Sequence, residues 1–264
     1  MARTALMNVM VQAVLKAGRG LARDFGEVEN LQVSVKGPGD FVSAADKRAD
    51  RTLIAELRKA RPSYGFLTEE SGTIAGEDTG NRWIVDPLDG TTNFLHGIPL
   101  FAVSVALERE GRVVAGIVYN PILNELYVAE RGTGAFLNDR RLRVAGRRNL
   151  DDALIGAEIP SLSNAAEGRS GDTARIGAQV AGARSVGSAA LELAWVASGR
   201  YDGYWHHALQ PWDFAAGELL VREAGGFATD LAGYERNNEP GPIVSGNKET
   251  HKKLLSLLAL TPAQ

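Results

Sequence analysis

The amino-acid sequence predicts an α+β protein built as a layered sandwich of helices and sheets. Three patterns indicate this class. Apolar residues recur at helical spacing near the start of the chain, short alternating segments follow one another in its middle like a strand meander, and Gly- and Ala-rich segments later alternate short strands with helices. This order favours an α+β sandwich over a regular array of βαβ units.

The first part of the chain is predicted to contain two helices around a short strand. Apolar residues from Ala5 to Leu21 recur at helical spacing, which predicts a helix up to about Arg23. A second amphipathic helix is expected from Ser43 to about Arg61, because Pro62 follows its end. Between them, residues 31–35 alternate like a strand.

Strands are predicted to dominate the middle of the chain. Short apolar or alternating segments indicate strands at residues 64–67, 83–85, 101–107, 112–119 and 125–129, followed by a hairpin in 135–144. Asn120 and Pro121 mark the turn between two of these strands. The polar, Gly-rich segment 71–81 is expected to be a loop.

The pattern changes near residue 150. Helices are expected at 188–199, 213–225 and 247–258, each starting at a Ser, Asp or Asn that can cap it, and a strand is expected at 243–244. A length of 264 residues fits one large domain or two fused halves. We therefore divide the chain into an α+β half, 1–140, and an α/β half, 141–264.

The composition excludes several classes of function. Lys and Arg total 29 and Asp and Glu total 32, so the formal net charge is −3 and provides no general attraction for nucleic acid or anionic membranes. The absence of cysteine excludes disulfides, thiolate nucleophiles, zinc–thiolate sites and Fe–S clusters. No apolar segment approaches the ~20 residues of a membrane span. Lys16 interrupts any signal-peptide core, so a cytoplasmic protein is expected.

The densest chemical feature is the segment from Asp86 to Phe94, with the sequence DPLDGTTNF. Residues 83–85 deliver two aspartates three positions apart, and Pro87 is expected to end the strand ladder so that a turn brings both side chains together. Converging carboxylates repel one another, and a divalent cation with a preference for oxygen ligands removes that cost. The alternative is a strand end with an Asp cap and an Asx-turn.

The residues after Asp89 favour a phosphate ligand. Gly90 lets backbone N–H groups approach closely, and Thr91 and Thr92 add hydroxyls near the start of a helical turn. Phosphatases that form an aspartyl-phosphate carry the spacing D-x-D-G-T, whereas this chain has D-x-x-D-G-T. Asp86 is therefore not interpreted as a nucleophile.

Two other acidic positions are candidates with structural alternatives. Glu69 and Glu70 follow a strand-like segment, and a solvated loop is the simpler interpretation for them alone. Asp213 lies where a helix begins, and an N-cap is the simpler interpretation for it alone.

Taken together, these segments resemble the inositol monophosphatase family. The resemblance is carried, in family order and spacing, by residues 66–71 (FLTEES), 83–94 (WIVDPLDGTTNF), 184–190 (RSVGSAA) and 212–217 (WDFAAG). It extends from Asp40 to Asn247. It implies an αβαβα sandwich of the inositol monophosphatase and fructose-1,6-bisphosphatase type, usually a homodimer, that hydrolyses small phosphomonoesters with two or three Mg²⁺ ions and is sensitive to Li⁺.

The resemblance also implies roles for individual residues. Glu69, Asp86 and the carbonyl of Leu88 would hold one metal ion, and Asp86, Asp89 and Asp213 would hold a second. Glu69 and Thr91 would orient and deprotonate the attacking water, with Asp46 supporting Thr91. The substrate-binding residues would be Leu88, Asp89, Gly90, Thr91, Thr92, Arg184, His206 and Asp213.

One position departs from the family pattern. Family members carry an acidic residue, which contacts sugar hydroxyls, about seven positions before the equivalent of Asp213; here that position is His206, followed by His207. Imidazole also donates and accepts hydrogen bonds, but not as a carboxylate does. Related substrates therefore stay open: fructose 1,6-bisphosphate, NADP, a nucleoside bisphosphate or histidinol phosphate.

A basic stretch leaves open a function of another class. Its members are Arg140, Arg141, Arg143, Arg147 and Arg148. A solvated hairpin edge is the simpler interpretation, because basic side chains commonly guard strand edges. The alternative is a face that binds RNA or the transcription machinery, as some bacterial members of the family do.

Overall fold

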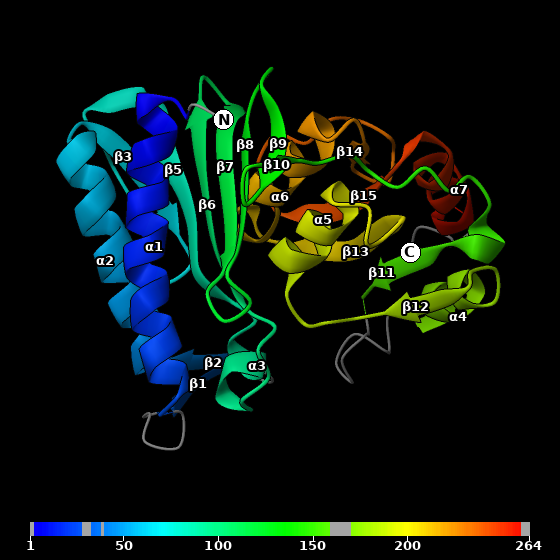
Figure 1. Cartoon of the computed structure of the whole chain (residues 1–264), viewed down its shortest axis with the longest axis horizontal. Helices are drawn as coiled ribbons and strands as arrows, with labels where there is room; N and C mark the ends of the chain where they lie inside the picture. The colour runs from blue at the N-terminus through cyan, green and yellow to red at the C-terminus, as the bar shows by residue number, and fades with distance from the viewer. Residues whose placement is uncertain (1–2, 28–32, 38–39, 159–169, 260–264) are drawn as a thin grey trace.

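The computed structural model describes residues 3–27, 33–37, 40–158 and 170–259. Over this part of the chain it confirms an α+β sandwich with five layers, in the order helices, sheet, helices, sheet, helices (Figure 1). Three hydrophobic clusters fill the four spaces between these layers, because one cluster extends from the larger sheet through the middle helices to the smaller sheet. No described helix combines the length and apolar character that crossing a membrane requires.

The first layer consists of α1 (Ala5–Phe25) and α2 (Ala44–Ala60), which lie side by side on one face of the larger sheet (Figure 1). Thr4 caps α1 by accepting a hydrogen bond from Met7 N. The buried faces of both helices contribute to the cluster that contains Trp83. α2 therefore lies directly against the strand that carries the aspartates.

The larger sheet has eight strands in the order β10-β9-β8-β7-β6-β5-β3-β4. Their bounds are β3 Tyr64–Thr68, β4 Gly72–Ile74, β5 Asp78–Asp89, β6 Ala102–Arg109, β7 Arg112–Asn120, β8 Glu125–Glu130, β9 Gly134–Leu137 and β10 Arg140–Arg141. Only β3 and β5 pair in parallel within this sheet. The predicted meander is confirmed in β6, β7 and β8.

The middle layer lies between the two sheets and contains α5 (Ala189–Ala197) and α6 (Pro211–Glu223). The smaller sheet has the order β12-β11-β13-β15-β14. Its strands are β11 Leu154–Ala157, β12 Gly182–Arg184, β13 Gly203–Leu209, β14 Phe227–Thr229 and β15 Gly241–Gly246. The outer layer is α4 (Ser170–Gly177) and α7 (Lys248–Leu258). The short elements β1 (Val33–Gly37), β2 (Asp40–Ser43), α3 (Thr91–Leu95) and the 3-10 helix η2 (Leu150–Asp152) complete the described fold.

Two sequence-based expectations about the segment around Asp86 are wrong. Residues 71–81 are not a loop throughout, because β4 pairs with β3 and β5 already begins at Asp78. Pro87 does not end the ladder either, because β5 runs on to Asp89 and pairs there with β6. The aspartates are brought together by an irregularity within the strand.

Candidate metal centre and substrate pocket

Three aspartates from two distant parts of the chain meet at one point. Asp86 and Asp89 lie at the end of β5, and Asp213 lies in the first turn of α6. One carboxylate oxygen from each lies within 4.8 Å of those of the others. Such a set of oxygen atoms is what hard divalent cations such as Mg²⁺ bind in proteins.

A bulge in β5 turns Asp86 and Asp89 to the same side. Asp86 pairs with Ser104 of β6 and Asp89 pairs with Ala102, so β5 advances three residues while β6 advances two. On a regular strand, residues three apart point to opposite faces; one extra residue restores a common face. Pro87 lies within this irregular stretch, where its missing N–H costs no regular ladder bond.

Asp213 is placed by the start of α6. The N-cap of this helix is Gln210, Pro211 follows it, and Asp213 is the third residue of the first turn. Its Oδ2 accepts a hydrogen bond from Gln210 N at 2.8 Å, which completes a capping box. The simpler interpretation of Asp213 as the N-cap is therefore wrong. Ser104 Oγ donates to Trp212 O at 3.1 Å and fixes this turn against the larger sheet.

Asp89 joins a second helix to the centre. Its Oδ2 accepts hydrogen bonds from Ser188 Oγ at 2.6 Å and from Ala190 N at 2.8 Å, both at the start of α5. Asp86 Oδ1 accepts from Leu88 N at 2.9 Å. Each aspartate is thus oriented by donors of its own before any ligand binds.

The electrostatics of the cluster call for a cation. Burial raises the pKa of Asp86 well above its ordinary value, and the charges of Glu69, Asp89, Asp213 and Asp46 raise it further. Burial and the charge of Asp89 likewise raise the pKa of Asp213, and burial raises the pKa of Asp89 to about 6. A divalent cation between these groups removes the repulsion, so the residues present fit a metal ion.

Glu69 and Asp46 lie close enough to act on this cluster. Glu69 follows β3, its N–H donates to Val85 O at 3.2 Å, and its charge raises the pKa of both Asp86 and Asp213. Asp46 lies in the first turn of α2 and is 1% exposed. The turn after Glu69 is held by Ser71, whose hydroxyl donates to Asp50 of α2 at 2.5 Å.

The segment after Asp89 makes a sharp turn. Gly90 has a φ of 92°, and a Cβ at this position would lie 3.0 Å from Leu100 O. A glycine is therefore required by both conformation and space. The hydroxyl of Thr91 donates to Leu88 O at 3.0 Å, which ties two of the predicted site residues together. Thr92 is exposed in the next position.

A pocket of about 370 Å³ opens beside the aspartates, and Asp89, Asp213 and His206 are among the residues that line it. Among the further lining residues, sequence reasoning did not assign a role in the site to Glu158, Ser188, Glu192 or Tyr204. Glu158 directly follows the apolar residues of β11, as Asp86 directly follows the apolar residues 83–85, and this position could have indicated it. Arg184, a predicted substrate-binding residue, is exposed at the end of β12, and its guanidinium donates to Ala183 O. It is not among the residues that line the pocket, whereas its neighbour Ser185 is.

The two histidines take different directions. His206 Nδ1 accepts a hydrogen bond from Ala208 N and lies 3.7 Å from Glu158 Oε2. His207 Nε2 lies 3.0 Å from Asp172 Oδ2 of α4, and its backbone N–H donates to Glu158 Oε2. Because Nδ1 accepts this bond, the proton of a neutral His206 ring is on Nε2, while Nδ1 is the nitrogen that lies near the Glu158 carboxylate.

Known proteins are similar to this chain over almost its whole length. The model of the inositol monophosphatase family matches residues 3–261. An inositol-1-monophosphatase of Mesorhizobium japonicum is 60% identical over 97% of this chain and 96% of its own length. The crystal structure of the extragenic suppressor protein suhB from Bartonella henselae has a TM-score of 0.94 at 55% identity, covering 98% of this chain and 100% of that one. The Nus factor SuhB of Escherichia coli K12 is 42% identical over 95% of this chain and 94% of its own length.

The fold, the family match and these relatives thus identify a phosphomonoester hydrolase. The chain belongs to the inositol monophosphatase family.

Proposed function

We propose that this protein is a Mg²⁺-dependent phosphatase that hydrolyses inositol monophosphate or a similar small polyol phosphate. The observation that carries the proposal is the convergence of Asp86, Asp89 and Asp213 within 4.8 Å at the edge of the pocket. A phosphate monoester is nearly a dianion, so a site made of carboxylates repels it unless cations are bound.

The residues present suit two or three ions. Asp86, Asp89 and Asp213 would hold one, and Glu69, Asp86 and the Leu88 carbonyl would hold another. When bound, Mg²⁺ neutralises the phosphoryl oxygens, lowers the pKa of a water molecule and stabilises the departing alkoxide.

The chain's own groups position the reactants. The backbone N–H groups from Gly90 to Thr92 would receive the phosphate oxygens at the sharp turn. Glu69 would accept the proton of the attacking water, and Thr91, fixed by its bond to Leu88 O, would orient that water. Asp46, buried in the first turn of α2, would support this arrangement. Phosphoryl transfer depends mainly on such positioning and on charge neutralisation.

The far side of the pocket suits hydroxyl groups. His206 Nε2–H is a donor and the Glu158 carboxylate is an acceptor, so together they would bind neighbouring hydroxyls of a polyol. This pair would take over the contact that an acidic residue at position 206 makes in the family.

A phosphate-release screen tests the proposal. The purified protein is assayed with Mg²⁺ against inositol 1-phosphate, fructose 1,6-bisphosphate, NADP, a nucleoside bisphosphate and histidinol phosphate, with and without Li⁺. Inositol 1-phosphate is expected to have the highest kcat/KM, and EDTA is expected to abolish its hydrolysis. Full activity after exhaustive metal removal would refute the Mg²⁺ dependence, and preference for another ester would refute the substrate.

The name of the Escherichia coli relative, Nus factor SuhB, favours a second candidate function in association with the transcription machinery. An Asp89→Asn variant distinguishes the two functions, because it removes a proposed metal ligand and is expected to be inactive as a phosphatase. If this inactive variant restores growth to a strain that lacks the protein, the binding function is the one that the cell requires.

A further inference from the structure

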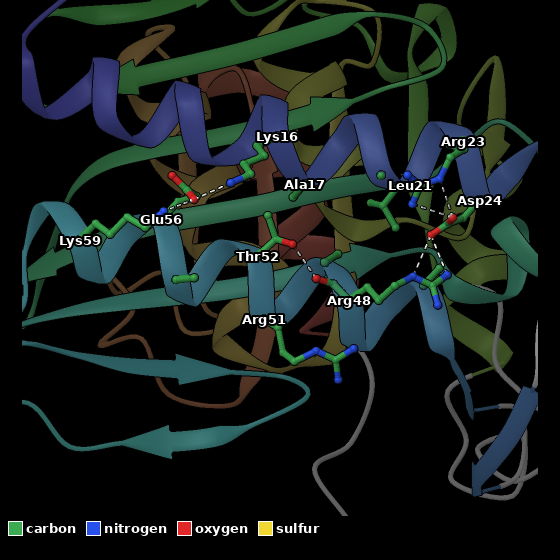
Figure 2. Close-up of a pocket in the computed structure, with 14 residues that line it drawn as sticks. Lys16, Ala17, Leu21, Arg23, Asp24, Arg48, Arg51, Thr52, Glu56 and Lys59 are labelled. Carbon is green, nitrogen blue, oxygen red and sulfur yellow. Dashed lines mark hydrogen bonds and ion pairs between the residues drawn. The ribbon is translucent and has the colours of Figure 1, made fainter.

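A groove of about 440 Å³ lies between α1 and α2, on the opposite side of the larger sheet from the middle layer (Figure 2). Small residues such as Ala17, Gly20 and Ala49 leave room for it between the two helices. Volumes of this size are typical of sites for small molecules. None of the residues proposed for the catalytic reaction lines it.

The groove carries a strong excess of positive charge. Five of its lining residues are basic and two are acidic: Lys16, Arg23, Arg48, Arg51 and Lys59 against Asp24 and Glu56. This excess stands out in a chain whose formal net charge is −3. A local concentration of cations on an acidic protein indicates an anionic ligand.

Six of these seven charges form two clusters, one at each end of the groove, and Arg51 lies apart from both (Figure 2). At one end, Glu56 accepts hydrogen bonds from Lys16 at 2.7 Å and Lys59 at 2.8 Å. These two ammonium groups lower the pKa of Glu56 to about 2. Each ammonium group has three donor hydrogens, so this end keeps donors and one positive charge for a ligand.

At the other end, Asp24 lies between two basic side chains, as Glu56 does at the first. Its Oδ1 accepts from Arg23 at 3.3 Å and its Oδ2 accepts from Arg48 at 2.7 Å. Guanidinium groups bind phosphate through paired hydrogen bonds. Lys16 and Arg23 are seven residues apart on α1, which places the two ends roughly 10 Å apart at 1.5 Å per residue. A single inorganic phosphate cannot span them, whereas an organic bisphosphate can.

The groove is connected to the catalytic centre through α2. Arg51 lines the groove, and its charge acts on the neighbouring Asp50. Asp50 holds the hydroxyl of Ser71, two residues after Glu69. Asp46, one turn earlier on the same helix, acts on Asp86. A ligand that moves Arg51 or α2 would therefore change the surroundings of the acidic cluster.

We propose that the groove between α1 and α2 binds a small organic phosphate with charged groups at both ends, and that its occupancy changes the Mg²⁺ requirement of the catalytic centre. The second part rests on the proposed Mg²⁺-dependent function, whereas binding itself does not. Because none of the proposed catalytic residues lines the groove, a ligand bound there would act on the reaction only through α2.

Binding is tested with hexane-1,6-bisphosphonate, whose C–P bonds a phosphatase does not hydrolyse. Isothermal titration of the metal-free full chain is expected to show one saturable site, with methylphosphonate at least tenfold weaker. Arg23→Gln and Lys59→Gln each remove one positive charge from one end of the groove. Both side chains are 69% exposed, so the fold is expected to survive. Each variant is expected to weaken binding at least fivefold. Arg140→Gln, on the exposed edge strand β10, is the matched control and is expected to change nothing.

Three results would overturn the site: no saturable binding, binding by the Arg23→Gln and Lys59→Gln variants as tight as by the unmodified protein, or tighter binding of a 20-nucleotide RNA through the same residues.

Coupling between the groove and the catalytic centre is tested by Mg²⁺ titration of p-nitrophenyl phosphate hydrolysis with and without the bisphosphonate. The bisphosphonate is expected to shift the half-saturating Mg²⁺ concentration at least threefold more in the unmodified protein than in the double variant that combines Arg23→Gln and Lys59→Gln. The double variant serves as the control, because the bisphosphonate still chelates Mg²⁺ and still competes with the substrate there. Equal shifts would refute coupling. Absence of any phosphatase activity would refute the proposed function and leave the binding result to stand by itself.

Discussion

The hydroxyl of Ser188 donates a hydrogen bond to Asp89 Oδ2 at 2.6 Å and accepts one from Leu191 N at 3.4 Å. One side chain therefore caps α5 and orients a proposed metal ligand. The middle helical layer and the end of β5 meet at this contact, so a change here acts on both stability and metal binding.

We predict that Ser188→Ala lowers the free energy of unfolding by about 1 kcal/mol through loss of the cap. It is also expected to raise the Mg²⁺ concentration for half-maximal activity several-fold, because Asp89 loses a donor that orients it. Urea unfolding and a Mg²⁺ titration of the initial rate measure the two effects. Ser198→Ala, at the other end of α5, serves as the control. An unchanged Mg²⁺ titration would show that Asp89 does not need this hydrogen bond.

Asp213→Asn is expected to lower kcat/KM at least a hundredfold while leaving the protein folded. The amide oxygen can still accept from Gln210 N, so the capping box survives, but one negative charge is lost from the proposed ligand set. Without metal, the variant is expected to melt at a temperature equal to or above that of the unmodified protein, because burial and Asp89 raise the pKa of Asp213. Thermal melts with and without Mg²⁺ check this, and a large fall in the metal-free melting temperature would contradict it.

Glu192 is expected to make the stability depend on pH. Burial raises its pKa to about 8, while Val186 N donates to its Oε1. Because the pKa in the folded state is above the unfolded value, the folded protein holds the proton more tightly. The stabilisation is therefore complete below about pH 4.5 and is lost as the pH rises towards 8.

We predict that Glu192→Gln removes this loss and makes the protein more stable than the unmodified chain at pH 8.5, by a few kcal/mol at most, since one pKa unit corresponds to about 1.4 kcal/mol. The amide oxygen can still accept from Val186 N. Denaturant unfolding of both proteins between pH 5 and pH 8.5 measures the difference. Parallel curves for the two proteins would show that Glu192 titrates normally.

Glu158→Gln is expected to raise KM for inositol 1-phosphate about tenfold, because a hydrogen bond to a charged acceptor is worth about 1.5–3 kcal/mol. The kcat/KM for p-nitrophenyl phosphate, which has no polyol hydroxyls, is expected to stay within twofold. Asp172→Asn alters the neighbouring His207 contact and is the control. An equal effect of Glu158→Gln on both substrates would assign Glu158 a structural role instead of a part in substrate preference.

Local patterns in the sequence predicted most of the elements. The helical spacing before Arg23, the meander after Phe101 and the caps at Ser188 and Asn247 are all set by nearby residues, and the structure confirms them. The role of Gln210 as the cap of α6 was missed because Asp at position 213 is itself a strong capping residue.

The long-range part of the site depended on the family resemblance. Nothing in the spacing of the chain relates Asp213 to Asp86, since helix α6 reaches the end of β5 only through packing between the two sheets. The same holds for Glu158, which meets His206 because β11 and β13 are parallel neighbours. Contacts of this kind follow from topology, which a single sequence does not specify.

The bulge in β5 requires that the segment from Asp86 to Asp89 keep its present number of residues. Removing a single residue between Asp86 and Asp89 would restore an even ladder with β6. Both carboxylates would stay on one face of the strand, but the second would shift away from Ser188. Lengthening the segment by one residue would turn the second aspartate towards the opposite surface. Substitutions can therefore change this segment, but insertions and deletions are expected to destroy it.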